Sequence, residues 1–204
     1  MKSKKTRRTQ SPEFRKRQIL DATQKILVQK GAAKTTIDLV AKKAGIGKGT
    51  VYLYYASKQE LLSGLQEDII FRSLEIPRNL MVNKNLSWTH KLNRLVEEWF
   101  RFDLEHTDLY HILFHELAAP SHTSMERCQK VLEELLQGGA NAGEFDIPDI
   151  SLTTTIMWHA FCGPCLHLPD QDEQEYQQAI QHIQLLFRRM VGAENHSSPQ
   201  SSTR

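Results

Sequence analysis

The sequence predicts an all-α protein, built from a three-helix head with a helix-turn-helix and from a larger helical bundle. Apolar residues recur at helical spacing along most of the 204 residues, and no segment alternates like a β-strand over a useful length. Residues 35–60, TTIDLVAKKAGIGKGTVYLYYASKQE, carry the caps and glycines of two short helices joined by a tight turn, followed by the start of a third helix. The charge pattern separates the same two regions.

Basic residues are concentrated near the N-terminus. The first 60 residues hold 15 Lys and Arg against 4 Asp and Glu, a balance of about +11, whereas the remainder holds 11 against 20, a balance of about −9. A basic head on an acidic body is typical of a protein that presents one end to a polyanion. A solvated basic region without a partner is the alternative interpretation.

The composition indicates a cytoplasmic protein without a membrane partner. No apolar run approaches the roughly 20 residues of a transmembrane helix, and the basic N-terminus lacks the apolar core of a signal peptide. The chain has three cysteines, an odd number, which argues against a disulfide framework and fits a reducing compartment.

The N-terminal region is expected to hold a disordered arm and the first helix. Residues 1–10, MKSKKTRRTQ, form the basic arm, which either reaches across DNA or only solubilises the chain. Ser11 followed by Pro12 is a favourable helix start, and Gly31 is expected to close this helix.

The other two helices of the head, which spans residues 11–56, are defined by caps and glycines. Thr35 with Asp38 predicts a capping-box-like start for the second helix, and Gly45 is expected to end it in the left-handed conformation. The third helix is predicted over residues 48–55. An S-x-x-E capping box at residues 57–60 opens the next helix.

Residues 57–192 are expected to form a helical body, and residues 193–204 a disordered tail. The first body helix is expected to end near Glu75, because Pro77 cannot continue it. Further amphipathic helices are predicted to begin at Ser87, to be capped by Thr107 and Asp108, to run from Met125 to about Gln137, and to cover residues 149–165 and 172–191.

The helix-turn-helix stretch resembles the DNA-binding signature of the TetR family of bacterial transcriptional regulators. Nearly every fixed position of that signature, including its A-G, G-T and S-K pairs, occurs in order and at the right spacing over residues 35–62. The rest of the chain resembles the family in length and helical layout only. One departure is Gly47, where many members have a serine whose hydroxyl can cap the helix.

The resemblance implies DNA contact for seven residues of the head. Residues at helix starts can bind phosphates, a tyrosine hydroxyl can donate to a phosphate, and Thr50 can offer a methyl or hydroxyl group to a base edge. Tyr55 is expected in the core rather than on DNA. The seven predicted contact residues are Thr36, Lys48, Gly49, Thr50, Tyr52, Tyr54 and Lys58.

The resemblance also implies that the body binds a ligand and forms a homodimer, which would place two recognition helices about 34–36 Å apart on a palindromic operator. Aromatic residues of the body are candidates either for an effector pocket or for plain core: Trp99, Phe100, Tyr110, Phe114, Met125, Trp158 and Phe161. Apolar stripes on the last two helices are the candidate dimer interface: Ile156, Met157, Ala160, Ile180, Ile183 and Phe187.

The sequence therefore predicts a bacterial DNA-binding regulator, most simply a repressor released by an unidentified, partly apolar effector. We expect no enzymatic activity, no cofactor and no metal site. An architectural DNA-binding protein without sequence preference is a further alternative, and it would show steep salt dependence with little preference for an operator.

The motif C-G-P-C at residues 162–165 matches the thioredoxin tetrad and keeps other functions open. Cys162 and Cys165 would follow a helix rather than open one, which is the wrong end for stabilising a thiolate. A helix break with two buried thiols is the structural interpretation. A redox- or metal-responsive regulator and a thiol-disulfide oxidoreductase are the alternatives. His111 and His115 have a metal-ligand spacing but lack the rest of a metal motif.

Overall fold

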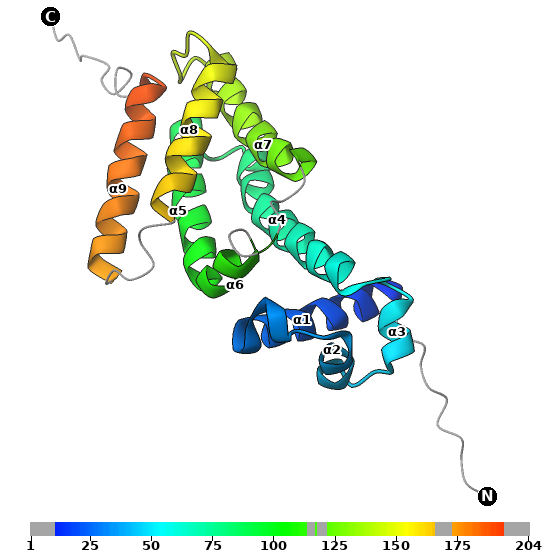
Figure 1. Cartoon of the computed structure of the whole chain (residues 1–204). Helices are drawn as coiled ribbons and strands as arrows, with labels where there is room; N and C mark the ends of the chain where they lie inside the picture. Colours follow the sequence, from blue (N-terminus) through cyan, green and yellow to red (C-terminus); the bar gives the residue numbers. More distant parts are fainter. Residues whose placement is uncertain (1–10, 114–116, 118–121, 166–172, 194–204) are drawn as a thin grey trace, which may run out of the picture. The chain divides into compact units, whose positions relative to one another are not determined.

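The computed structural model describes residues 11–113, 117, 122–165 and 173–193, with the backbone alone at 122–125, 162–165 and 173. All regular structure in these ranges is helical, which confirms the predicted all-α class (Figure 1). The elements are α1 (Pro12–Lys34), α2 (Ile37–Ala44), α3 (Lys48–Tyr52), α4 (Lys58–Val82), α5 (Trp88–Glu105), α6 (Thr107–His111), α7 (His122–Asn141), α8 (Ile150–Cys165) and α9 (Glu173–Met190). No helix in the described ranges has the length and apolar character needed to cross a membrane.

The chain divides into two compact units whose boundary lies inside α4. The first unit runs to Asp68 and includes the segment that begins at Asp108, and the second unit starts at Ile69. Side chains explain this boundary. The Arg17 guanidinium donates to both carboxylate oxygens of Asp68 at 2.9 and 3.0 Å, and the Gln66 amide donates to the Leu113 carbonyl at 2.8 Å. The N-terminal half of α4 therefore belongs with the head.

Helix α1 starts as predicted, and Gly31 interrupts its helical geometry where the sequence predicted its end. The Ser11 hydroxyl accepts from the Phe14 N–H at 3.2 Å, and Pro12 occupies the first turn. Gly31 has φ 75° and ψ 170°, which interrupts the helical geometry before a final turn to Lys34. The buried residues of α1 are Ile19, Leu20, Ala22, Thr23, Ile26 and Leu27.

The start of α2 differs by one residue from the prediction. Thr36, not Thr35, is the N-cap, and its hydroxyl accepts from the Leu39 N–H at 3.3 Å. Thr35 is fully buried and donates its hydroxyl to the Gly31 carbonyl at 2.9 Å, so burial selects which of the two threonines caps the helix. The end of α2 is as predicted, because Gly45 is left-handed with φ 67° and ψ 33°.

Helix α4 begins with the predicted Ser57 cap, the Glu60 carboxylate bonds one residue before that cap, and the helix runs further than predicted. The Ser57 hydroxyl accepts from the Glu60 N–H at 3.1 Å, and the Glu60 carboxylate accepts from the Ala56 N–H at 2.6 Å. The expected end near Glu75 is wrong, because α4 continues through Pro77 to Val82.

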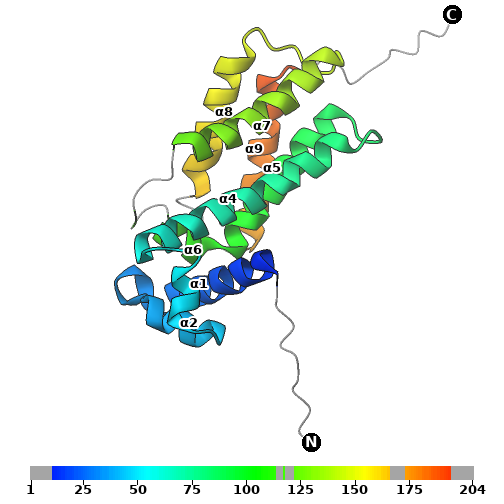
Figure 2. The ribbon, with the colours of Figure 1, turned by 90° about the vertical axis from the view of Figure 1, so that its right-hand side faces the viewer.

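Helices α5, α7, α8 and α9 form the helical bundle of the second unit. Helix α5 packs against α7 and α9, and α7 lies beside α8 in both views (Figures 1 and 2). Helix α7 is longer than predicted because its two glycines stay helical under aromatic rings. An added Cβ would lie 2.1 Å from the Trp88 ring at Gly138 and 2.0 Å from the Phe145 ring at Gly139. The predicted capping role of Thr107 is also wrong, since its hydroxyl donates to carbonyls of α5.

Candidate nucleic-acid interface

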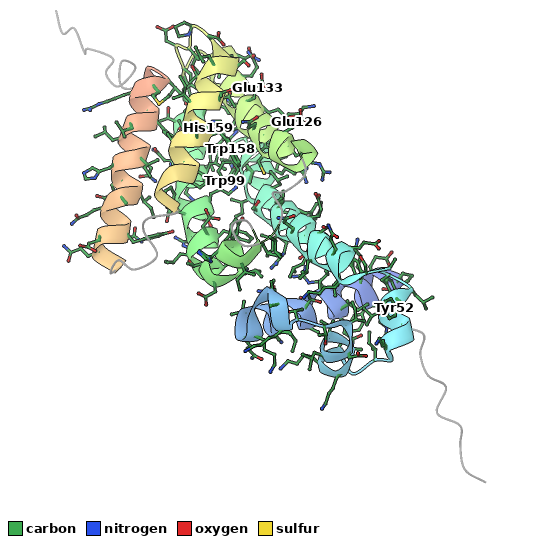
Figure 3. All side chains as sticks on the ribbon, in the orientation of Figure 1. Tyr52, Trp99, Glu126, Glu133, Trp158 and His159 are labelled. Carbon is green, nitrogen blue, oxygen red and sulfur yellow. The ribbon has the colours of Figure 1, made fainter. Side chains whose placement is uncertain are left out.

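Helix α3 is a short helix with one buried anchor and exposed side chains around it. Val51 is completely buried, whereas Tyr52 is 46% exposed and Leu53, the residue after the helix, is 83% exposed. Figure 3 labels Tyr52 on this helix. A helix held by a single apolar anchor presents its other side chains to solvent, where they are available to a major groove.

The structure places the seven predicted contact residues at the starts of α2 and α4 and along α3 and the turn after it. Thr36, Lys48, Gly49 and Tyr52 are exposed, and Thr50, Tyr54 and Lys58 are half-buried. At Gly47, the N-cap of α3, an added Cβ would meet the Thr50 hydroxyl at an ordinary 3.8 Å. A serine side chain would therefore fit at Gly47, where this chain departs from the family signature.

Lys48 and Asp38 form an ion pair that joins α2 to α3. The Lys48 ammonium donates to the Asp38 carboxylate at 2.9 Å and lies 6.0 Å from the centre of the Tyr52 ring. The hydrogen bond to Asp38, together with its negative charge, raises the pKa of Lys48. Both side chains are exposed, so the pair is open to competition from a phosphate.

Lys58 has an internal role that the sequence did not predict. Its ammonium donates to the Ala32 carbonyl at 2.6 Å and contacts the Ala33 carbonyl at 3.4 Å. A cation at the last carbonyls of a helix caps them and complements the helix dipole. Lys58 thus joins the end of α1 to the start of α4, and its predicted phosphate contact stays a prediction.

Leu53 is a surface residue of this region that the sequence analysis missed. It follows Tyr52 at a variable position of the signature, so no fixed motif position marks it. Its exposure, 83%, is the highest among the large apolar residues of the described chain. A leucine there offers an apolar surface of the kind that contacts a thymine methyl group.

Tyr55 lies in the core of the first unit, as predicted. It is 4% exposed, and its ring occupies the space beside Gly64, where an added Cβ would lie 2.5 Å from the ring. Its hydroxyl has no hydrogen-bond partner among the described residues. Burial, with smaller contributions from the charges of Asp68 and Glu60, raises the pKa of Tyr55 to about 12.

We expect the raised Tyr55 pKa to make folding sensitive to alkaline pH. The folded chain holds the phenol proton up to about pH 12, whereas the unfolded chain loses it near the ordinary value of 10.0. The free energy of unfolding should therefore be fully retained below pH 10 and should fall as the pH rises towards 12. Denaturant unfolding at pH 9, 10 and 11 should show a smaller fall for Tyr55→Phe than for the wild type. Equal falls in the two proteins would mean that Tyr55 does not contribute to the pH dependence of the free energy of unfolding.

Four of the seven predicted pocket residues come together in the second unit. Measured between ring centres, Trp99 lies 5.9 Å from Trp158, and both are labelled in Figure 3. Trp99 lies 5.3 Å from Phe161, and Phe100 lies 4.8 Å from Phe161. We call these four residues, with Tyr176, the aromatic cluster. Tyr176 was missed; its ring lies 5.9 Å from that of Phe100, and its hydroxyl donates to the Phe100 carbonyl.

The other predicted pocket residues do not join this cluster in the described structure. Tyr110 is half-buried and belongs to the first unit. Phe114 and the Met125 side chain lie outside the described residues.

Most residues of the predicted dimer interface are already covered by the subunit's own helices. Four of its six residues are buried inside the subunit: Met157, Ile180, Ile183 and Phe187, with exposures of 0, 3, 8 and 3%. Ile156 and Ala160 are exposed. Helical periodicity detects apolar positions, but it does not separate those that fill a subunit's own core from those that face a second subunit.

The residues that carry the cysteine and histidine alternatives lie largely outside the described side chains. The backbone at residues 162–165 is the end of α8, and the side chains of Cys162 and Cys165 lie outside the description. His115 also lies outside the described residues, and His111 is exposed. Where side chains are described, no group of three or more His, Cys, Asp or Glu is arranged to hold a metal ion.

Residues 19–65 match the family model for bacterial regulatory proteins of the tetR family. An uncharacterized HTH-type transcriptional regulator of Bacillus subtilis, YvdT, is 30% identical over 115 residues, which are 56% of this chain and 58% of that protein. The fatty acid metabolism regulator protein of the same organism is 31% identical over 58 residues, 28% of this chain and 30% of that protein. The chain thus matches less than two thirds of the length of these curated relatives.

Solved structures share the fold over most of the chain. The fatty acid degradation regulator FadR from Bacillus halodurans superposes with a TM-score of 0.71 at 22% identity, over 88% of this chain and 96% of that chain. FadR from Bacillus subtilis, solved in complex with stearoyl-CoA, has a TM-score of 0.70 at 18% identity, over 87% of this chain and 98% of that chain.

Proposed function

Because the chain belongs to the TetR family of helix-turn-helix transcriptional regulators, we propose that it is a repressor released from its operator by a small effector with a large apolar part. The observation that carries the proposal is the exposed face of α3, where Tyr52 and Leu53 surround the buried anchor Val51 in a basic head. Occupation of an operator that overlaps a promoter would block transcription sterically.

The aromatic cluster supports an apolar effector. Its rings supply apolar surface, and the Tyr176 hydroxyl, which donates to the Phe100 carbonyl, is a buried polar group beside them. The Bacillus subtilis structure of the same fold holds stearoyl-CoA, so a long-chain acyl thioester is the first effector class that we propose here. Release requires that the effector bind the DNA-free conformation more tightly than the DNA-bound one.

A homodimer would allow one small head to read a palindrome, and the exposed face of α8 and α9 supports its interface. Leu152, Ile156 and Leu186 are 56, 49 and 55% exposed. Leu152 and Ile156 are four residues apart and so share one face of α8. We propose these residues, with Ala160, in place of the four buried ones.

The first test is binding to the intergenic DNA beside the chain's own gene, at fixed salt, against a random duplex of equal length. A sequence-specific regulator should prefer the intergenic DNA by about 10³-fold or more. Stearoyl-CoA should then lower that affinity, with free coenzyme A and stearate as matched controls. A ratio near one would contradict the proposal that this DNA contains an operator. A ratio near 10³ that no acyl thioester changes would contradict only the effector class.

A further inference from the structure

Helix α4 contains a proline that deprives one carbonyl of its usual partner. In an α-helix the N–H of each residue donates to the carbonyl four residues earlier. Pro77 lies inside α4 and has no N–H, so it cannot donate to the carbonyl of Ser73. In a regular helix a proline ring also clashes with the carbonyl four residues earlier. The conformation of α4 at this point therefore depends on what else binds the Ser73 carbonyl.

The missing donor comes from α5. The indole N–H of Trp99 donates to the Ser73 carbonyl at 2.9 Å, and both residues are buried, at 6 and 8% exposure. The Ser73 hydroxyl makes its own bond, donating to the Ile70 carbonyl at 2.8 Å. A side chain 26 residues away thus replaces the backbone donor that proline lacks, which explains why α4 continues where the sequence predicts an end.

The same indole belongs to the aromatic cluster. Its ring meets Trp158 edge to face, with 83° between the ring planes; Figure 3 labels both residues. The same ring lies 5.3 Å from the ring of Phe161. A molecule that inserts between these rings has to displace at least one of them. Because a hydrogen bond weakens steeply as its length and angle depart from the ideal, a small rotation of Trp99 suffices to release the Ser73 carbonyl.

We propose that Trp99 is a positioning residue that couples the aromatic cluster to the conformation of α4 at Pro77. While the indole holds the Ser73 carbonyl, α4 keeps the form that is competent for operator binding. When a ligand turns the indole away, the buried carbonyl loses its donor and α4 changes its bend. Helix α4 begins directly after the helix-turn-helix and contributes its first residues to the first unit, so its bend bears on DNA binding. The ligand and DNA steps rest on the proposed function; the link between Trp99 and Pro77 does not.

A double-mutant cycle tests this link without any ligand. Trp99→Phe keeps an aromatic ring and removes the N–H, so we expect the Tm to fall by about 3–8 °C and the operator dissociation constant to rise at least about fivefold. Pro77→Ala restores a backbone N–H that can donate to the Ser73 carbonyl. In the Pro77→Ala background, Trp99→Phe should therefore lose most of both effects, which is the signature of two residues acting on one group.

Trp158→Phe is the matched control, because it trims the same kind of ring in the same cluster. Its effects on Tm and on operator affinity should be equal in the wild-type and Pro77→Ala backgrounds. Equal effects of Trp99→Phe in the two backgrounds would overturn the inference. If the two substitutions are coupled in Tm but not in operator affinity, the proposed effect of Trp99 on DNA binding is overturned. The hydrogen bond from Trp99 to the Ser73 carbonyl then has a purely structural role. If no operator is found, the proposed function fails, and the Tm cycle still decides whether Trp99 acts through Pro77.

Discussion

We expect Tyr52→Ala to weaken binding to the proposed operator by at least about 30-fold while the chain stays folded. Tyr52 is 46% exposed on α3, with the Lys48 ammonium 6.0 Å from the ring centre, so its removal opens no cavity in the core. A contact to a base or phosphate is worth about 1–3 kcal/mol, and a dimer loses two of them. Even the lower value, doubled, corresponds to about 30-fold in affinity.

The measurement is fluorescence anisotropy with labelled operator at fixed salt, together with a thermal melt of each variant. Tyr52→Phe separates the ring from the hydroxyl, because it keeps the aromatic ring and removes the group that can donate to a phosphate. We expect an intermediate affinity for it. Wild-type affinity of Tyr52→Ala, with an unchanged melt, would mean that α3 is not the recognition helix.

We expect Ile156→Asp to raise the dissociation constant of the proposed homodimer at least about 100-fold and to abolish tight binding to the proposed operator. Ile156 is 49% exposed on α8 within the subunit, so a carboxylate there is solvated in the monomer. In a two-fold interface the same carboxylate would be buried twice without a partner, at a cost of several kcal/mol. A separated monomer holds only one half-site, and the affinity gained from linking two heads is lost.

Sedimentation velocity at micromolar concentration checks this prediction, with operator binding as the second measurement. Val82→Asp is the matched control, because Val82 on α4 is an exposed apolar residue, at 76%, outside the proposed interface. It should remain dimeric. Met157→Asp distinguishes the two versions of the interface, since a fully buried position predicts unfolding rather than a folded monomer. If Ile156→Asp is still dimeric at wild-type affinity, the subunits meet elsewhere.

The helix boundaries of the head could be predicted largely from local interactions along the chain. Most of its helix boundaries depend on side chains that bond to the backbone within three or four residues, as Ser11 and Ser57 do, or on a glycine with a left-handed conformation, as at Gly45. Such signals are complete within a short window of sequence. The cap of α2 could not be chosen between Thr35 and Thr36 from such local signals. Both residues have the required hydroxyl, and only the burial of Thr35 distinguishes them.

The sequence by itself determined the helical class, the helix-turn-helix and the residue types that α3 presents, because each depends on neighbours along the chain. The tertiary structure decided the course of α4 through Pro77, since the donor for the Ser73 carbonyl is Trp99 of another helix. It also decided which apolar residues of α8 and α9 fill the subunit and which remain exposed, as Met157 and Ile156 show side by side. Periodicity identifies an apolar stripe, but which part of it stays exposed depends on helices that are distant in sequence.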